Sequence, residues 1–149
     1  MREIVIPKEQ AVFRMDRFGF WYNDGGRFEH KKIIDYFNIS IRRDEQGYFV
    51  EQITEDVREK VYFDYEDTPL FAIDVHIAEH IRVFLNTRKT LRLSPGNLFV
   101  QQDNLYMTVG DERIKFSDRA MLKLAACMDH DGESYCFLVD GKRYVLPER

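Results

Sequence analysis

The stretch FWYNDGGRF at residues 20–28 joins an aromatic strand, a glycine turn and the approach to a helix. An amphipathic helix follows, and a turn at Gly47 then leads into a second strand-like segment. A similar order recurs later, with LYM at residues 105–107, a turn, another short helix, and YCFLV at residues 135–139. The sequence therefore predicts a strand-helix-strand unit that the chain uses twice.

Positions in the two helical segments match at a constant offset, so that Phe28 corresponds to Phe116 and Lys31 to Arg119. Two similar halves would create a cleft between them, and clefts are where small ligands usually bind. The alternative is a chance resemblance between two strand-helix-strand segments.

Composition indicates a soluble globular chain of 149 residues, forming one domain or two small lobes. No apolar run approaches the roughly 18–20 residues of a membrane span, and the first residues lack the apolar stretch of a signal peptide. We therefore expect a cytoplasmic protein that does not enter membranes. Its two cysteines, Cys127 and Cys136, are expected to be reduced.

Charge is unevenly distributed along the chain, whose net charge is -4. Residues 27–43 and 80–92 are basic, whereas residues 55–67 and 128–140 are acidic. A net acidic chain is a poor general binder of nucleic acid, because binding requires many cations facing phosphate. The two basic stretches could still converge on one small anion. The alternative is that they are solvated faces paired with the acidic stretches.

The expected fold class is α+β with mostly antiparallel sheet. Apolar spacing predicts helices at residues 29–38 and 117–128, with Ser117 as the N-cap of the second. Alternation predicts a hairpin over residues 71–85 and a strand-turn-strand segment over residues 91–100. The segment Glu66–Pro69 resembles a linker, so we expect an N-terminal lobe of residues 1–70 and a C-terminal lobe of residues 71–149.

Two motifs could carry chemistry, and for each the structural interpretation is favoured. His76 to His80 spells H-x-x-E-H, a zinc pattern that requires a helix, but its flanks alternate like strands. Cys127 and His130 crowd a helix end, yet neighbours in sequence rarely have the geometry of a nucleophile and its base. We predict no metal, no cofactor and no catalytic residue. An enzyme remains open but is not favoured.

The candidate ligand-binding residues are aromatic and polar side chains at turns. Arg42 and Arg43 precede the Gly47 turn, one element after Trp21, and aromatic faces beside guanidinium groups suit a base and its phosphate. Asn86 and Arg88 form a second polar tip. The predicted set is therefore Trp21, Arg42, Arg43, Asn86 and Arg88, and the alternative is that these are ordinary hairpin residues.

The order of several motifs resembles the bacterial family called domain of unknown function 1285. The residues that carry the resemblance are Trp21, Phe37, Ile41–Asp44, Gly47–Val50, Lys60-Val61, Glu66–Pro69, Asn86 and Phe116–Arg119. The resemblance implies a duplicated core and a second lobe loosely like the pleckstrin-homology fold. It also implies a ligand site between the lobes, for a nucleotide-like molecule in signalling.

We therefore expect an uncharacterised cytoplasmic protein that binds a small anionic, nucleotide-like ligand between two lobes in a signalling or regulatory role. One alternative is a protein-protein interaction module without a ligand, which would present a flat apolar patch or an extended edge strand. The other is a small hydrolase, which would need a nucleophile or metal with an orienting base.

Overall fold

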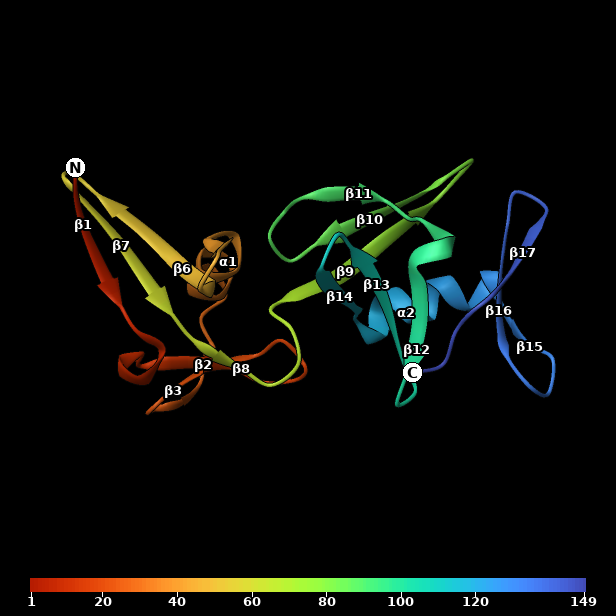
Figure 1. The fold of residues 1–149 in the computed structure, drawn as a ribbon, viewed down its shortest axis with the longest axis horizontal. Helices are drawn as coiled ribbons and strands as arrows, with labels where there is room; N and C mark the ends of the chain where they lie inside the picture. Colours follow the sequence, from red (N-terminus) through yellow and green to blue (C-terminus); the bar gives the residue numbers. More distant parts are fainter. The chain divides into compact units, whose positions relative to one another are not determined.

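The computed structural model describes all of residues 1–149, and the chain divides into two compact units, Met1–Pro69 and Leu70–Arg149 (Figure 1). Both units mix helix with strands, and most strand pairs are antiparallel. The expected α+β class with mostly antiparallel sheet is therefore confirmed. No helix combines the length and the apolar character needed to cross a membrane.

Unit 1 (Met1–Pro69) contains two four-stranded sheets. The first has the order β4-β3-β2-β8 and comprises β2 (Phe13–Met15), β3 (Trp21–Asn23), β4 (Gly26–Arg27) and β8 (Asp64–Tyr65). The second has the order β1-β7-β6-β5 and comprises β1 (Arg2–Ile6), β5 (Ile41–Asp44), β6 (Gly47–Thr54) and β7 (Val57–Tyr62). A 3-10 turn, η1 (Lys8–Gln10), connects β1 to β2.

The helix of unit 1, α1 (Lys31–Ile39), packs through the ring of Phe37. It begins two residues later than predicted because His30 keeps an extended backbone as the N-cap. None of its residues is fully buried. The Phe37 ring meets the rings of Phe13, Trp21 and Phe28 edge to face, at centroid distances of 4.9, 5.3 and 5.0 Å. Such contacts stabilise beyond simple burial, and they fix the helix against the β2–β3–β4 sheet.

Unit 2 (Leu70–Arg149) contains a six-stranded sheet of order β11-β10-β9-β14-β13-β12 and a three-stranded sheet of order β15-β16-β17. The six strands are β9 (Leu70–Ile77), β10 (Ile81–Leu85), β11 (Thr90–Arg92), β12 (Leu98–Gln101), β13 (Asn104–Val109) and β14 (Glu112–Phe116). The three strands are β15 (Met128–His130), β16 (Tyr135–Val139) and β17 (Lys142–Val145). The hairpin predicted over residues 71–85 is confirmed as β9 and β10.

The segment predicted as strand-turn-strand forms two strands that do not pair. β11 and β12 lie at opposite ends of the six-stranded order, although only residues 93–97, with the 3-10 turn η2 (Pro95–Asn97), connect them. In a flat sheet these edges would be about 24 Å apart, and six residue steps span at most about 20–22 Å. The sheet must therefore curl, which follows from the twist of its strands.

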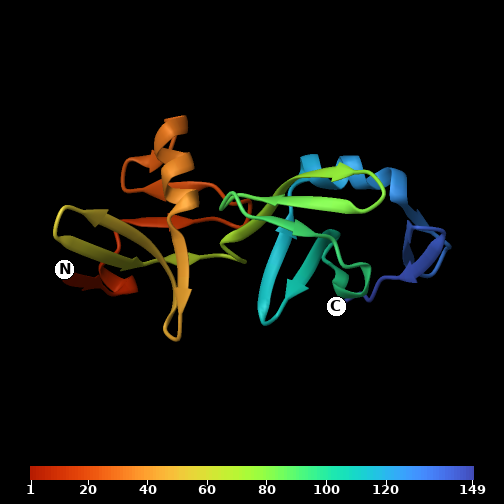
Figure 2. The ribbon, with the colours of Figure 1, turned by 90° about the horizontal axis from the view of Figure 1, so that it is seen from above.

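The helix of unit 2, α2 (Asp118–Leu124), runs along β9, as Figure 2 shows. The predicted N-cap is confirmed, because the Ser117 Oγ accepts a hydrogen bond from the Ala120 backbone N–H at 3.2 Å. Ala120 and Leu124 are buried against the sheet. The helix continues as a 3-10 turn, η3 (Ala125–Cys127), and ends earlier than predicted as regular α-helix.

The two units share an order of elements. In unit 1 the consecutive strands β2–β4 form an antiparallel meander, followed by α1 and by the antiparallel meander β5–β7. In unit 2 the strands β12–β14 form a meander, followed by α2 and by the meander β15–β17. The neighbours differ, since β4 is a sheet edge whereas β14 pairs with β9 in parallel.

Candidate functional site

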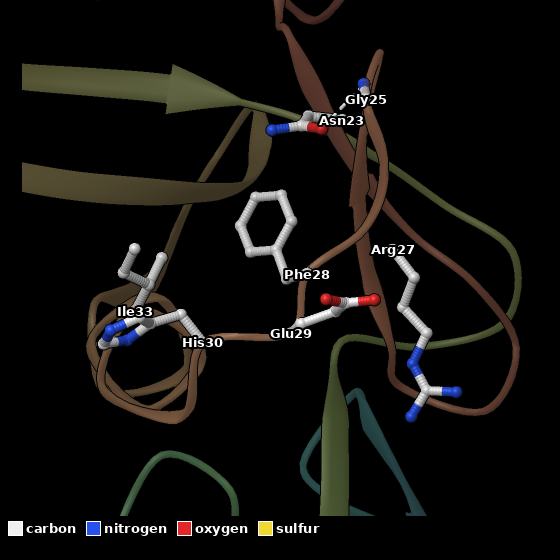
Figure 3. A pocket seen from close by; sticks show the side chains of 7 residues that line it. All are labelled: Asn23, Gly25, Arg27, Phe28, Glu29, His30 and Ile33. Carbon is white, nitrogen blue, oxygen red and sulfur yellow. Dashed lines mark hydrogen bonds between the residues drawn. The ribbon is translucent and has the colours of Figure 1, made fainter.

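A hollow of about 410 Å³ lies in unit 1 where the β3–β4 hairpin leads into α1 (Figure 3). Its lining residues are Asn23, Gly25, Arg27, Phe28, Glu29, His30 and Ile33. All of them lie between residues 23 and 33 of the sequence. The tight β3–β4 turn brings the strand and the start of the helix close together in space. The Asn23 Oδ1 fixes that turn by accepting a hydrogen bond from the Gly25 N–H at 2.9 Å.

Two side chains give this hollow an aromatic surface and a cation. Figure 3 shows the Phe28 ring between the hairpin and the start of α1, with Arg27 pointing away from that ring. The Arg27 guanidinium lies 3.6 Å from the centroid of the Phe20 ring. A guanidinium held against an aromatic face loses little further freedom when its N–H groups bind an anion. The geometry therefore preorganises Arg27 for a carboxylate or phosphate.

The first turn of α1 adds positive potential at the same wall. His30 is the N-cap, but its side chain makes no capping hydrogen bond, and the first turn holds no acidic residue. The N–H groups at a helix start carry partial positive charge and need acceptors. Lys31 forms an ion pair with Asp35 at 2.7 Å, whereas Lys32 has no ion pair. Glu29 is the one acid on the lining.

The predicted stacking residue, Trp21, is a core residue instead. Only 1% of its surface is exposed, and its ring lies 4.9 Å from the Phe63 ring, centroid to centroid. Its indole N–H donates to the Asn38 Oδ1 at 2.8 Å, which ties β3 to α1. A ligand cannot stack on a ring that is already enclosed, so the predicted role of Trp21 is wrong for this structure.

The two predicted arginines of β5 lie on the surface but serve local contacts. The Arg42 Nη1 donates to the carbonyl oxygens of Ile39 and Ile41, at 2.8 and 2.9 Å. It thereby satisfies a carbonyl at the end of α1, where a cation also suits the helix dipole. The Arg43 guanidinium lies 5.6 Å from the centroid of the Tyr48 ring. Neither residue lines the hollow at the start of α1.

In unit 2 the predicted residues Asn86 and Arg88 belong to the β10–β11 turn. Asn86 is buried, and its Oδ1 accepts a hydrogen bond from the Phe71 N–H at 3.0 Å, while its own N–H donates to the Phe71 carbonyl. This double contact holds the turn against β9, so Asn86 is structural. Arg88 is exposed, and its backbone lies in the left-handed region, with φ 68°.

Neither sequence motif has the geometry that its chemistry requires. His76 lies in β9 and His80 in the turn before β10, so the helix that H-x-x-E-H needs is not formed. Burial raises the pKa of the Cys127 thiol, which is opposite to the shift that would favour a reactive thiolate. His130 instead packs edge to face on Tyr135, at a centroid distance of 4.6 Å.

Sequence reasoning missed Arg27, Phe28 and His30 as site residues. The available signal was the Gly25-Gly26-Arg27-Phe28 stretch next to a helix whose N-cap position holds histidine instead of Ser, Thr, Asp or Asn. A helix start without a capping side chain leaves donors free for another acceptor.

Comparisons with known proteins give the fold of the chain. No family model and no curated protein matches the sequence. A crystal structure of a DUF1285 family protein from Silicibacter pomeroyi DSS-3 is similar, with a TM-score of 0.67 and 16% identity, covering 98% of this chain and 84% of that one. A DUF1285 family protein from Shewanella baltica OS155 has a TM-score of 0.56 and 18% identity, covering 80% of this chain and 94% of that one.

The fold of this chain is thus similar to that of these two DUF1285 family proteins. The resemblance predicted from the sequence motifs is confirmed at this level. At these identities the likeness extends to the fold alone.

Proposed function

We propose that this protein binds a small anionic, nucleotide-like ligand in the hollow at the start of α1, in a regulatory role. The observation that supports it most is the position of the Arg27 guanidinium, stacked 3.6 Å from the Phe20 ring centroid at the wall of this hollow. This assignment replaces the predicted set, since Trp21 is enclosed and Arg42 caps α1.

Each part of the hollow has a matching part in such a ligand. A phosphate would accept hydrogen bonds from the Arg27 guanidinium and from a ring N–H of His30, and the N–H groups at the start of α1 would add positive potential. Phe28 offers part of its ring to a flat heterocycle. The volume of about 410 Å³ lies in the range of roughly 300–1,000 Å³ that is typical of small-molecule sites.

The negative charge of Glu29 would repel a bound anion, so removing this charge should increase the affinity. Replacing Glu29 by Gln removes a negative charge from the lining while keeping the size of the side chain. We expect Glu29→Gln to strengthen binding of an anion several-fold, and Arg27→Gln to weaken it by about 10- to 100-fold, the range for one charge-assisted hydrogen bond.

The experiment is a thermal-shift screen of nucleoside mono-, di- and triphosphates against the full chain, followed by calorimetry on any hit. A ligand at a hundred times its dissociation constant should stabilise the protein by about 2.7 kcal/mol. Arg14→Gln is the matched control, because Arg14 also stacks on an aromatic ring, that of Tyr22, but does not line the hollow. Equal losses of ligand affinity in Arg27→Gln and Arg14→Gln, or no hit in the screen, would contradict the proposal. Either result would favour the protein-protein interaction module instead.

Three further expectations belong to this proposal. The shared order of meander, helix and meander supports an origin of the two units by duplication, which a superposition of residues 20–50 on residues 105–139 would test. The resemblance of unit 2 to the pleckstrin-homology fold can be tested by superposition too. A cytoplasmic location follows from the sequence expectation and can be checked by fractionating cells.

A further inference from the structure

Unit 2 contains a second hollow, of about 380 Å³, which the proposed function does not use. Its lining residues are His80, Ile81, Arg92, Leu93, Ser94, Pro95, Gly96, Val139, Asp140, Lys142 and Tyr144. They come from three separate segments, namely the β9–β10 turn, the β11–η2 connection and the β16–β17 hairpin. Tertiary structure alone brings these segments together, which distinguishes this hollow from a chance run of charge in the sequence.

Basic side chains reach the hollow from each of the three segments. Arg92 and Lys142 supply a guanidinium and an ammonium group, and His80 adds an imidazole that can donate a hydrogen bond. None of the three forms an ion pair or a side-chain hydrogen bond within the protein. Arg92 and Lys142 therefore have no counter-ion within the protein.

The sheet itself places Arg92 at an electrostatic cost. Arg92 lies directly opposite Arg82 in the antiparallel pair of β10 and β11. Like charges at directly opposite positions destabilise a sheet, and a bound anion would offset this repulsion. The Arg82 guanidinium already has local contacts. Its Nη2 lies 3.5 Å from the His76 Nδ1, and its Cζ lies 5.7 Å from the centroid of the Phe84 ring. Arg92 is therefore the member of the pair that remains available.

Neutral groups in the hollow suit an oxyanion as well. Ser94 and Tyr144 supply hydroxyl groups that can donate hydrogen bonds. The buried side chains of Ile81 and Leu93 form an apolar floor. Charged hydrogen bonds strengthen where an apolar surface lowers the local dielectric constant.

Asp140 is the one acid on the lining, and the hairpin accounts for it. Asp140 has φ 51° and Gly141 has φ 70°, so the pair forms the two-residue turn between β16 and β17 that Asp-Gly sequences favour. Its presence thus reflects turn chemistry, and it leaves the lining with two cations against one acid.

From these observations we propose that the unit 2 hollow binds the phosphate group of a phosphorylated small molecule, through Arg92, Lys142 and the hydroxyl groups beside them. The inference goes beyond the proposed function, because it concerns a different unit and shares no residue with the hollow at the start of α1. Each site can therefore exist without the other.

The experiment is calorimetry of the full chain with inorganic phosphate and with pyrophosphate, at a fixed ionic strength set with sodium chloride. We expect saturable binding with one site, weakened about tenfold or more by Arg92→Ala and by Lys142→Ala, as for loss of one charged hydrogen bond. Lys89→Ala is the matched control, because Lys89 is exposed in the same basic stretch but does not line the hollow. It should change affinity less than about twofold.

Two further variants separate a site from diffuse positive charge. Asp140→Asn keeps a residue that tolerates the left-handed turn and should strengthen binding several-fold. Gly96→Phe should block binding while leaving every charge in place, because a Cβ at Gly96 meets no atom within 4 Å and the added ring can enter the hollow. Circular dichroism and a melting curve would confirm that each variant is folded.

Several outcomes would overturn the proposal. Absence of saturable binding of either probe would refute it directly, as would equal losses in Lys89→Ala and Lys142→Ala. Binding that responds to Arg27→Gln but not to Arg92→Ala would assign the phosphate to unit 1 instead. In the expected case Arg27→Gln leaves phosphate binding to unit 2 unchanged, so failure of one site does not imply failure of the other.

Discussion

Replacing Trp21 by Phe tests whether this side chain is part of the core or part of a ligand site. Trp21 is the only tryptophan, its ring is enclosed by Phe13, Phe37 and Phe63, and its N–H donates to Asn38 at 2.8 Å. The substitution leaves the Asn38 oxygen without its donor, which costs about 1 kcal/mol at a half-buried position. It also leaves a void where the larger indole was, which costs about 1–2 kcal/mol more.

We therefore expect Trp21→Phe to lower the free energy of unfolding by about 2–3 kcal/mol, a large part of the roughly 5–15 kcal/mol of a small protein. Urea denaturation followed by far-UV circular dichroism measures it without depending on tryptophan fluorescence. Asn38→Ala in the same background should cost less than in the wild type, by about 1 kcal/mol, because the two residues share one hydrogen bond. A loss below about 0.5 kcal/mol, together with weaker ligand binding, would refute the core assignment.

Three other predictions follow from single contacts. Arg42→Ala should lower stability by about 0.5–1.5 kcal/mol in urea denaturation, because it removes hydrogen bonds to two carbonyls, whereas Lys31→Ala should cost no more than about 0.5 kcal/mol; equal effects would return Arg42 to an ordinary surface residue. Ser117→Ala should cost about 1 kcal/mol through loss of the α2 cap, and Ser117→Asp should restore most of it; failure of this rescue in thermal melts would argue against a capping role. The Tyr62 hydroxyl donates a hydrogen bond to the Asp44 carboxylate at 2.5 Å and so lowers the pKa of Asp44. The ionised Asp44 therefore stabilises the fold fully above its ordinary pKa of about 3.8, and this stabilisation is lost as pH falls below that value. Burial and the same hydrogen bond raise the pKa of Tyr62 to about 12, so the stabilisation it contributes is present below pH 10 and is lost as pH rises through 12. Tyr62→Phe should flatten the stability curve measured between pH 2 and 5, and an unchanged acid limb would contradict the pairing.

The elements that depend on local pattern could be predicted from the sequence. The β9–β10 hairpin follows from alternation, and α2 follows from Ser117 and the apolar spacing after it, because both signals act over a few residues. The fold resemblance also came from short motifs, and the structural comparisons agree with it.

Pairing over long distances in the sequence could not be predicted. β11 and β12 look like two arms of one hairpin, but the curled sheet places them at opposite ends of its strand order. Exposure was equally hidden, since Ile73 and Ile77 share the parity of Phe71 and Val75, and yet the first two are exposed and the last two buried. Simple alternation cannot separate these residues, and the β9–β10 pairing breaks it: Leu85 pairs with Ala72 and Phe84 with Asp74, so a bulge leaves Ile73 without a partner position.

The same limit applies to the candidate sites. From the sequence alone it could be seen that residues 27–43 and 80–92 are basic, and that Arg42 and Arg43 lie one element after Trp21. Only the tertiary structure shows that Trp21 is enclosed, that Arg42 caps a helix, and that Lys142 joins Arg92 across fifty positions of sequence. The physical reason is that burial and electrostatic partners are properties of neighbours in space. A residue type limits what a side chain can do, and packing decides which of those possibilities remains available.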